Sequence, residues 1–197
     1  MYGTVGKKRQ PVDHLASDQL ILVDESDREV GQLGKADCHA GGGVLHRAFS
    51  LFVFNGRGEL LVQQRSARKR LWPNYWSNSC CSHPRVGESM TVAIHRRLME
   101  ELGLSCTLNF LFKFQYQARY DEATSEHELC SVFFGRSAMR AQPNREEIAG
   151  LRWVSTQDLQ SEIDSAAERY TPWFKLEWER IRRDHLEDIL TPGGMPA

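Results

Sequence analysis

The stretch at residues 88–103 reads ESMTVAIHRRLMEELG and carries a complete set of signals for an α-helix. Ser89 suits the N-cap, where a hydroxyl accepts a hydrogen bond from a free backbone N–H, and Gly103 suits the left-handed residue that ends many helices. Between them, apolar residues at positions 94, 98 and 102 recur every fourth residue, with further ones at 92 and 99. The sequence therefore predicts a helix with one apolar face.

Strand signals lie on both sides of this helix. The clearest is at residues 44–65, where the turn sequence Asn-Gly-Arg-Gly at 55–58 joins two apolar runs into a hairpin. Residues 19–35 read as strand, polar turn and strand, and residues 110–120 and 127–137 read as an antiparallel pair. Because strands and helices interleave, the expected fold is one α/β (α+β) domain with a mixed sheet sandwiched between helices.

Two more helices are expected toward the carboxyl end. Ser155 and Asp158 have capping-box spacing at the start of residues 155–170. The last helix opens at Thr171-Pro172, because proline suits the first helical position. Its expected stripe consists of Phe174, Trp178, Ile181 and His185.

Composition favours one well-cored globular domain. The chain has 197 residues, 41% of them hydrophobic and 26% charged, with a formal net charge of -1. We expect the domain at residues 19–190, between a flexible N-terminal arm at 1–18 and a disordered tail at 191–197. Near-neutral charge argues against general nucleic-acid binding, and the longest apolar runs are far too short to span a membrane. With no secretory signal pattern and five cysteines at irregular spacing, a cytoplasmic protein with free thiols is expected.

The sequence SNSCCSHP at residues 77–84 gathers groups that carry chemistry. Side chains two apart on an extended strand share a face, so Cys81 lies with His83 while Cys80 points away. The segment could be a metal clip, a redox pair, or a catalytic cysteine beside a metal-binding histidine.

The same parity places Glu126 and Glu128 together and sends His127 to the other side. Two carboxylates on one face repel each other, which favours a cation there, although a solvated edge strand would also tolerate them. His39 and His46 flank the loop CHAGGG, and either one is more often a surface or core histidine than a ligand.

Three imidazoles and two carboxylates would nevertheless complete a metal shell if the fold gathers them. Such mixed ligation suits zinc, manganese or iron better than magnesium. The five candidates are His39, His46, His83, Glu126 and Glu128.

Two charged segments point to an anion and a second cation. Glu100 and Glu101 lie in the last turn of the helix at 88–103, where the helix dipole disfavours acids unless a cation relieves them or they are solvated. Arg65, Lys69 and the neighbouring basic residues of QRSARKR, at 64–70, either form a solvated hairpin end or clamp phosphate oxygens. No glycine-rich nucleotide loop follows a strand.

Residues 82–104 resemble the Nudix box in part: Glu88, Arg96, Glu100, Glu101 and Gly103 match it, while Ser82 replaces a glycine and Arg97 a glutamate. The missing carboxylate counts against hydrolysis. More specifically, about residues 20–178 resemble the type I isopentenyl-diphosphate delta-isomerases. The resemblance rests on five segments in order, CHAGGGVLHRAFS, WPNYWSNSCCSHPRVGES, RRLMEELG, EHELCSVF and TPWFKLEW.

The resemblance implies a Nudix-like fold and an isomerase of isoprenoid biosynthesis. Cys81 would be the catalytic thiol, Glu128 the acid or base on the opposite face, Tyr116 its assistant, and Trp178 the indole that shields a carbocation. The five histidines and glutamates named above would bind one divalent metal, taken to be Mn, Zn or Mg.

The resemblance also implies how the substrate, isopentenyl diphosphate, is held. A Mg ion bound with the diphosphate would be held by Glu101 and the main-chain carbonyl of Cys81. We expect a monomer or weak homodimer. The implied diphosphate contacts are Lys35, Arg65, Lys69 and Arg97.

Two other readings stay open. One is a Nudix pyrophosphohydrolase acting on a nucleoside diphosphate derivative, and it leaves Cys81 unexplained. The other is a non-catalytic zinc-binding module, which predicts a closed structural site without an open pocket and gives the basic cluster no role.

Overall fold

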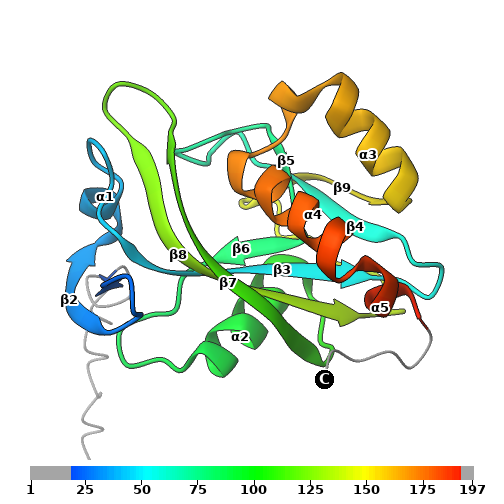
Figure 1. The fold of residues 1–197 in the computed structure, drawn as a ribbon, viewed down its shortest axis with the longest axis horizontal. Helices are drawn as coiled ribbons and strands as arrows, with labels where there is room; N and C mark the ends of the chain where they lie inside the picture. The colour runs from blue at the N-terminus through cyan, green and yellow to red at the C-terminus, as the bar shows by residue number, and fades with distance from the viewer. Residues whose placement is uncertain (1–18, 192–197) are drawn as a thin grey trace, which may run out of the picture.

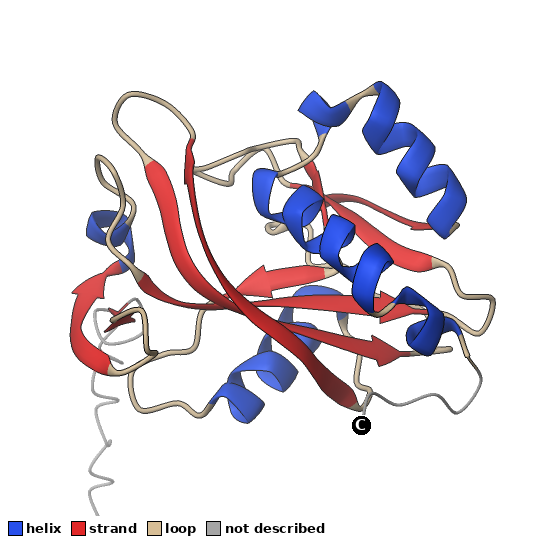
Figure 2. Ribbon diagram, in the orientation of Figure 1, coloured by secondary structure: helices blue, strands red, loops and turns tan. Residues whose placement is uncertain are grey.

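A mixed sheet with helices on both faces forms the body of the protein (Figures 1 and 2). The computed structural model describes residues 19–191, and in these β3 pairs in parallel with β8 while the other named strand pairs are antiparallel. The strands are β1 (Gln19–Val23), β2 (Glu29–Gly34), β3 (His46–Phe54), β4 (Leu60–Arg65), β5 (Trp76–Ser77), β6 (Cys80–Ser82), β7 (Leu108–Arg119), β8 (Ser125–Arg136) and β9 (Ile148–Val154). The helices are α1 (Lys35–Cys38), α2 (Met90–Leu102), α3 (Thr156–Ser165), the 3-10 helix η2 (Ala167–Arg169), α4 (Pro172–Asp184) and α5 (Leu186–Leu190).

Helix α2 forms as its sequence predicts. The Ser89 hydroxyl accepts a hydrogen bond from the Val92 N–H at 3.3 Å, and Gly103 ends the helix with φ 61°. Ile94, Leu98 and Leu102 are buried against one face of the sheet. The predicted apolar face therefore becomes one of the two main contacts between a helix and the sheet.

Strand β3 lies at the centre of the sheet, and its side chains contribute to a hydrophobic core on each face. Phe49 and Leu51 point toward α2, whereas Phe52 and Phe54 pack with the aromatic residues of α4. Burying such a side chain stabilises the fold by roughly 1.5–3 kcal/mol. The hairpin at 55–58 forms as predicted, but β3 and β4 separate after the pair Phe54 and Leu60. This separation frees β3 to pair with β6 and β8.

The apolar stripe of α4 contains one acid. Glu177 is fully buried on the same helical face as Trp173 and Ile181. The Cys130 thiol donates to Glu177 Oε1 at 3.5 Å, whereas Glu177 Oε2 is buried without a hydrogen-bond partner. Burial raises the pKa of Glu177 to about 8, although the polar neighbours Ser50 and Cys130 act in the lowering direction, so the group is largely protonated at neutral pH.

The helices α1 and α5, both very short, were not predicted from the sequence. The predicted arm at 1–18 and residues 192–197 of the predicted tail lie outside the described residues. Thr191, the first residue of that tail, is described, and its carbonyl accepts a hydrogen bond from Arg136. None of the helices in residues 19–191 has the length and hydropathy needed to cross a membrane.

We expect Glu177→Gln to reduce the pH dependence of stability. The folded protein keeps a proton on this carboxyl at pH values where an unfolded carboxyl, with a pKa of 4.5, has lost it. The free energy of unfolding therefore falls as the pH rises from about 4.5 to about 8, by on the order of 3–5 kcal/mol. Urea denaturation at about pH 5 and about pH 8 measures this loss, which the glutamine variant should not show.

Glu179→Gln is the matched control, because Glu179 lies on the same helix and is exposed. It should keep the wild-type dependence. Equal losses of stability in the wild type and Glu177→Gln would contradict the assignment of a neutral acid at this position.

Candidate active site and metal centre

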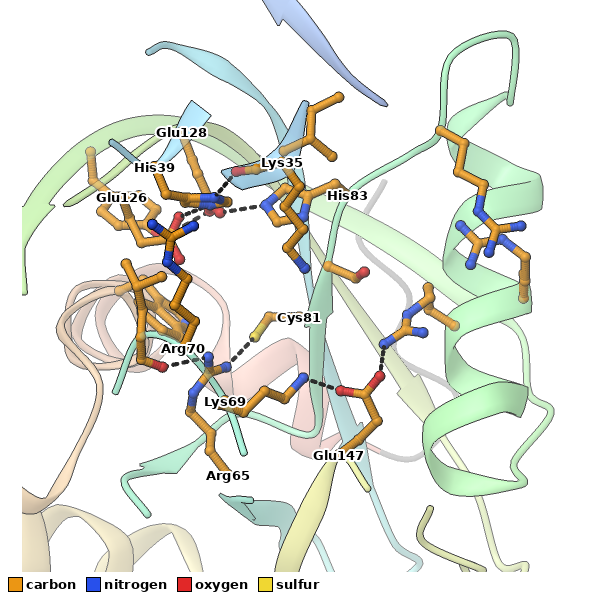
Figure 3. Close-up of a pocket in the computed structure, with 18 residues that line it drawn as sticks. Lys35, His39, Arg65, Lys69, Arg70, Cys81, His83, Glu126, Glu128 and Glu147 are labelled. Carbon is orange, nitrogen blue, oxygen red and sulfur yellow. Dashed lines mark hydrogen bonds and ion pairs between the residues drawn. The ribbon is translucent and has the colours of Figure 1, made fainter. Parts of the chain in front are cut away.

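One cavity of about 270 Å³ gathers most of the residues singled out in the sequence (Figure 3). It opens between the β4–β5 loop, β6, the long β7–β8 pair and the first turn of α4. Cys81, Tyr116 and Glu128 line it, as do His39, His83 and Glu126. The predicted diphosphate contacts line it as well: Arg65, Lys69 and Arg97 form its basic end, and Lys35 lies beside His39 and His83 (Figure 3).

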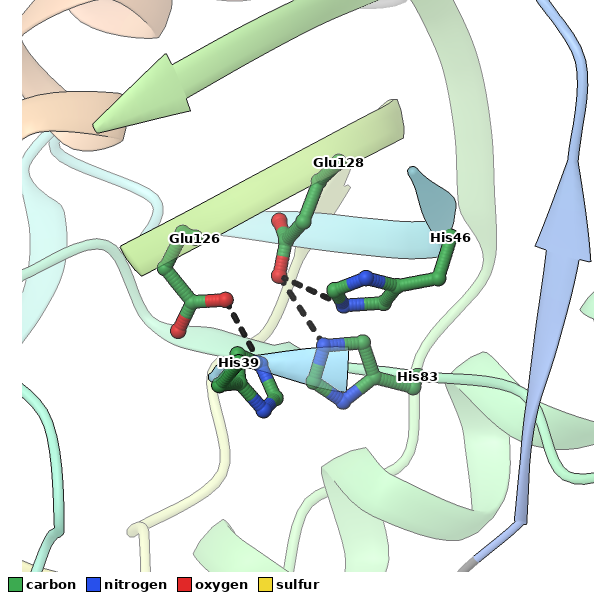
Figure 4. Close-up of side chains that lie close together, drawn as sticks. All are labelled: His39, His46, His83, Glu126 and Glu128. Atoms are coloured by element: carbon green, nitrogen blue, oxygen red, sulfur yellow. Dashed lines mark hydrogen bonds and ion pairs between the residues drawn. The ribbon is translucent and has the colours of Figure 1, made fainter. Parts of the chain in front are cut away.

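At the opposite end, five side chains form a compact cluster (Figure 4). Their ligand atoms all lie within 4.8 Å of one another. The fold brings them together because His46 on β3 is the register partner of Glu128 on β8, with α1 and the segment after β6 adding one histidine each. The members are His39, His46, His83, Glu126 and Glu128.

The donor atoms in this cluster fit a divalent cation. His39 and His46 each direct Nδ1 at a backbone carbonyl, of Lys35 at 2.5 Å and of Val44 at 2.7 Å, which leaves the Nε2 lone pair facing the centre. Metal-binding histidines are typically oriented by a hydrogen bond of this kind. His39 Nε2 lies 2.7 Å from Glu126 Oε2, yet both atoms are buried without a hydrogen bond. Such converging lone pairs are the arrangement that a cation would stabilise.

The protonation state of His46 agrees with a ligand role. Burial, followed by the neighbouring His83, lowers the pKa of His46 to about 4, so this imidazole is neutral at pH 7. Neutral imidazole is the form that binds metals.

Glu128 connects the cluster to the rest of the cavity. Its Oε1 lies 2.9 Å from His83 Nε2, and its Oε2 accepts a hydrogen bond of 2.8 Å from the Tyr116 hydroxyl. Tyr116 and Glu128 are register partners on β7 and β8. Burial, followed by the charge of Glu128, raises the pKa of Tyr116, so the phenol keeps its proton. One carboxylate therefore faces the histidines with one oxygen and a proton donor with the other.

The two adjacent cysteines point to opposite faces of β6, as their parity predicts. Cys80 is fully buried among α2 residues, whereas Cys81 borders the cavity. Burial raises the pKa of Cys81 to about 12, although the neighbouring Arg65 acts in the lowering direction. A catalytic thiolate at this position would need a nearby cation strong enough to lower its pKa. In the structure burial outweighs the cation, and Cys81 is a neutral thiol at pH 7.

Arg65 fixes the loop that covers this thiol. Its guanidinium donates to the carbonyls of Leu71 at 2.9 Å and Trp72 at 3.1 Å, and it also donates to Cys81 Sγ at 3.7 Å. It lies 5.2 Å from the ring centroid of Trp173. Trp72 adopts φ 45°, a left-handed conformation that costs a non-glycine residue of order 1–3 kcal/mol. The arginine therefore stabilises a strained loop and contacts the sulfur.

The predicted tryptophan is corrected by the structure. Trp178 does not line the cavity, because it faces the core and its indole N–H donates to Gln160 Oε1 at 3.1 Å. Trp173, one turn earlier on α4, forms the wall instead. The sequence did carry a signal for this position, since Trp173 follows Pro172 at the start of the helix and lies four residues before Glu177.

The acidic residues at the end of α2 pair with arginines of the same helix. Glu101 is buried at the end of α2, where it contacts Arg97, and Gln63 Nε2 lies 3.5 Å from it. It does not line the cavity itself. The two arginines of α2 therefore relieve the acids at the helix end, since Arg96 and Arg97 also contact Glu100. Sequence reasoning missed Glu147, which lines the basic end.

Comparisons with known proteins identify the family to which the chain is related. The family description NUDIX domain matches residues 44–174. Isopentenyl-diphosphate Delta-isomerase 1 of Photorhabdus laumondii is 42% identical over 174 residues, covering 87% of this chain and 99% of its own. Isopentenyl-diphosphate Delta-isomerase of Saccharopolyspora erythraea is 42% identical over 183 residues, covering 91% and 90% of the two chains.

Solved structures show the same fold. DR0079 from Deinococcus radiodurans superimposes with a TM-score of 0.68 at 25% identity, covering 85% of this chain and 99% of its own. The MutT protein from Methanosarcina mazei gives 0.60 at 18% identity, covering 71% and 94%. The latter likeness speaks for the fold alone.

We expect Mn²⁺ or Zn²⁺ to raise the melting temperature of metal-free wild-type protein, and Glu126→Gln to abolish most of this rise. A ligand at 100 times its dissociation constant stabilises by about 2.7 kcal/mol. Because the substitution also removes the carboxylate 2.7 Å from His39, the quantity compared is the rise that metal causes in each protein. Thermal unfolding with and without metal measures both effects.

His127→Gln is the control on the same strand. His127 points away from the cluster and contacts Gln115, so this variant should keep the full response to metal. Equal responses in Glu126→Gln and the wild type would exclude Glu126 as a ligand.

Proposed function

The chain belongs to the NUDIX-domain family of isopentenyl-diphosphate Delta-isomerases, and we propose that it interconverts isopentenyl diphosphate and dimethylallyl diphosphate. The observation that carries the proposal is one cavity lined by two groups able to exchange protons, Cys81 and Glu128, together with a basic end. Its substrate is a small molecule with an apolar five-carbon part and a diphosphate.

The chemistry requires one proton donor and one acceptor. An unactivated alkene is too weak an acid to be deprotonated directly, so a proton first adds to the terminal CH₂ carbon and leaves a tertiary carbocation. Loss of a proton from the neighbouring CH₂ group then forms the new double bond. One proton enters and one leaves, so the reaction needs no oxidant or reductant. Two side chains on different strands suffice for these transfers.

We assign the two transfers to the Cys81 thiol and the Glu128 carboxyl. Tyr116 supports Glu128, because its hydroxyl donates to the oxygen that faces away from the histidines. Since the reaction is an interconversion, the group that donates a proton in one direction accepts it in the other. The neutral Cys81 thiol carries a proton that it can donate. Each turnover leaves the two groups in exchanged protonation states, so a proton must pass between them before the reaction runs again in the same direction.

The proposed metal centre keeps Glu128 in place. The five residues of the cluster would hold one divalent cation, Mn, Zn or Mg. Such a cation supplies positive charge that lowers the proton affinity of a carboxylate. A Mg ion would accompany the diphosphate, near Glu101 and the Cys81 carbonyl.

The basic end would anchor the diphosphate away from the reacting carbons. Arg65, Lys69 and Arg97 line it, with Lys35 nearer the metal cluster, and arginine is well suited to paired phosphate oxygens. A firm grip also opposes ionisation of the allylic product and fixes the five-carbon part relative to the two proton carriers.

Trp173 replaces Trp178 as the aromatic group for the carbocation. An indole face attracts a cation by about 0.5–2 kcal/mol. Trp173 is 3% exposed and forms the cavity wall beside Tyr116, with ring centroids 6.2 Å apart.

The other readings are less well supported. For a Nudix hydrolase, Arg97 stands where the box has a glutamate, and this guanidinium, which pairs with Glu101 and Glu147, has no lone pair with which to ligate a catalytic metal. For a structural zinc module, the cavity beside the metal cluster and its basic end would have no purpose.

Incubation with isopentenyl diphosphate in deuterated water tests the function. We expect deuterium in the methyl groups of dimethylallyl diphosphate, detected by NMR, without phosphate release. Cys81→Ala should lower turnover by a factor of about 10³ or more, whereas Cys80→Ala should keep it, because only Cys81 faces the cavity.

Cys80→Ala controls for loss of folding, since Cys80 is the more deeply buried of the two. Liberated phosphate would support the hydrolase reading, and full turnover by Cys81→Ala would exclude this thiol from the reaction.

The variants Trp173→Leu and Trp178→Leu distinguish a tryptophan that lines the cavity from one that packs in the core. We expect Trp173→Leu to lower kcat by about tenfold, as loss of a contact worth about 1.4 kcal/mol to the carbocation would. Trp178→Leu should instead lower the melting temperature and leave kcat of the folded fraction unchanged. Reversal of this pattern would restore Trp178 to the site.

A further inference from the structure

The basic end of the cavity contains one carboxylate that neither the metal cluster nor the proton transfers use. Among the described residues that line the cavity, three are acidic, and two of these, Glu126 and Glu128, belong to the cluster. The third, Glu147, lies directly before β9 and faces the basic residues (Figure 3).

Glu147 forms ion pairs with two of the proposed diphosphate contacts. Its Oε2 contacts Lys69 Nζ, and its Oε1 lies 3.2 Å from Arg97 Nη2. That same arginine nitrogen contacts Glu101 Oε1, so two carboxylates converge on one cationic group. Although burial opposes ionisation, Lys69 and Arg97 hold the pKa of Glu147 at about 2, and it is negative at pH 7.

The backbone holds this carboxylate in position. The Glu147 carbonyl accepts from the Ser66 N–H at 2.9 Å, and its N–H donates to the Asn144 carbonyl at 3.0 Å. The next residue, Ile148, is fully buried and pairs with Arg65. The main chain of Glu147 is therefore fixed, and its carboxylate is held at the basic end by the ion pairs with Lys69 and Arg97.

This placement favours one charge state of the ligand. A metal-free diphosphate must compete with Glu147 for Lys69 and Arg97, and it is repelled by both Glu147 and Glu101. A diphosphate that carries Mg²⁺ has less negative charge and presents a cation that oxygen ligands prefer. The converging carboxylates would then attract the ligand.

We propose that Glu147 is a selectivity residue that makes the site bind the magnesium complex of a diphosphate in preference to the free anion. The inference rests on the proposed function, since it concerns the same diphosphate end. Glu147 acts through the charge that it adds beside Lys69 and Arg97, and it takes no part in the proton transfers.

Calorimetric titration with inorganic pyrophosphate tests this, using protein preloaded with one equivalent of Mn²⁺ or Zn²⁺, with and without added Mg²⁺. We expect Mg²⁺ to tighten binding to the wild type. In Glu147→Gln the free anion should bind on the order of tenfold more tightly, a gain of about 1.4 kcal/mol, so that the effect of Mg²⁺ shrinks by the same factor. Glu147→Asp keeps the charge and should keep the effect of Mg²⁺.

Glu146→Gln is the matched control. Glu146 is the preceding residue, but it is largely exposed, does not line the cavity and pairs with Arg68. It should behave as the wild type in both titrations. Circular dichroism confirms that each variant is folded.

Three results would overturn the inference: no binding of pyrophosphate by the wild type, an unchanged effect of Mg²⁺ in Glu147→Gln, or equal weakening of both forms of the ligand in that variant. The last would leave Glu147 as a structural ion pair only. Failure of the proposed function has a different signature, namely no dimethylallyl diphosphate formed by the wild type in the deuterium experiment.

Discussion

The pairing of β3 with two non-consecutive strands is the constraint on which the site depends. On one side the antiparallel register sets Ser50 against Cys81, and on the other the parallel register sets His46 against Glu128. Opposed residues point to the same face of a sheet, so the thiol, the carboxylate and one histidine all face α4. A slip of one residue in either pair would turn these groups into the opposite core.

The charged groups that line the cavity lie in separate clusters. The five imidazole and carboxylate groups lie together at one end of the cavity, Arg65, Lys69 and Arg97 lie at the other with Glu147 among them, and a neutral thiol contacts Arg65. Behind the cavity, Glu177 is buried as an acid of raised pKa, so it adds little negative charge beneath the site at neutral pH. The proposed binding of the diphosphate and the proposed proton transfers therefore use different parts of the cavity.

Local periodicity was enough to predict much of the fold and of the site. The caps of α2, the hairpin at 55–58 and the opposite faces of Cys80 and Cys81 all follow from rules that span a few residues, and the structure confirms them. The α1 turn that places His39 has only four residues and too little periodicity to be seen.

What the sequence could not predict depends on packing between distant segments. Trp173 and Trp178 both face inward from α4, and only the position of the β4–β5 loop decides which one meets the cavity. Glu147 precedes β9 in a segment with no pattern of its own, and its partners lie 78 and 50 residues away in the chain. Such contacts have no local signature.

The guanidinium of Arg65 ties the strained turn at Trp72 to the sulfur of Cys81. One side chain, Arg65, therefore holds both the loop at Leu71 and Trp72 and the Cys81 sulfur. A change in the length or shape of the turn at Leu71 and Trp72 would therefore displace the Arg65 guanidinium and alter the contact that it makes with the Cys81 sulfur.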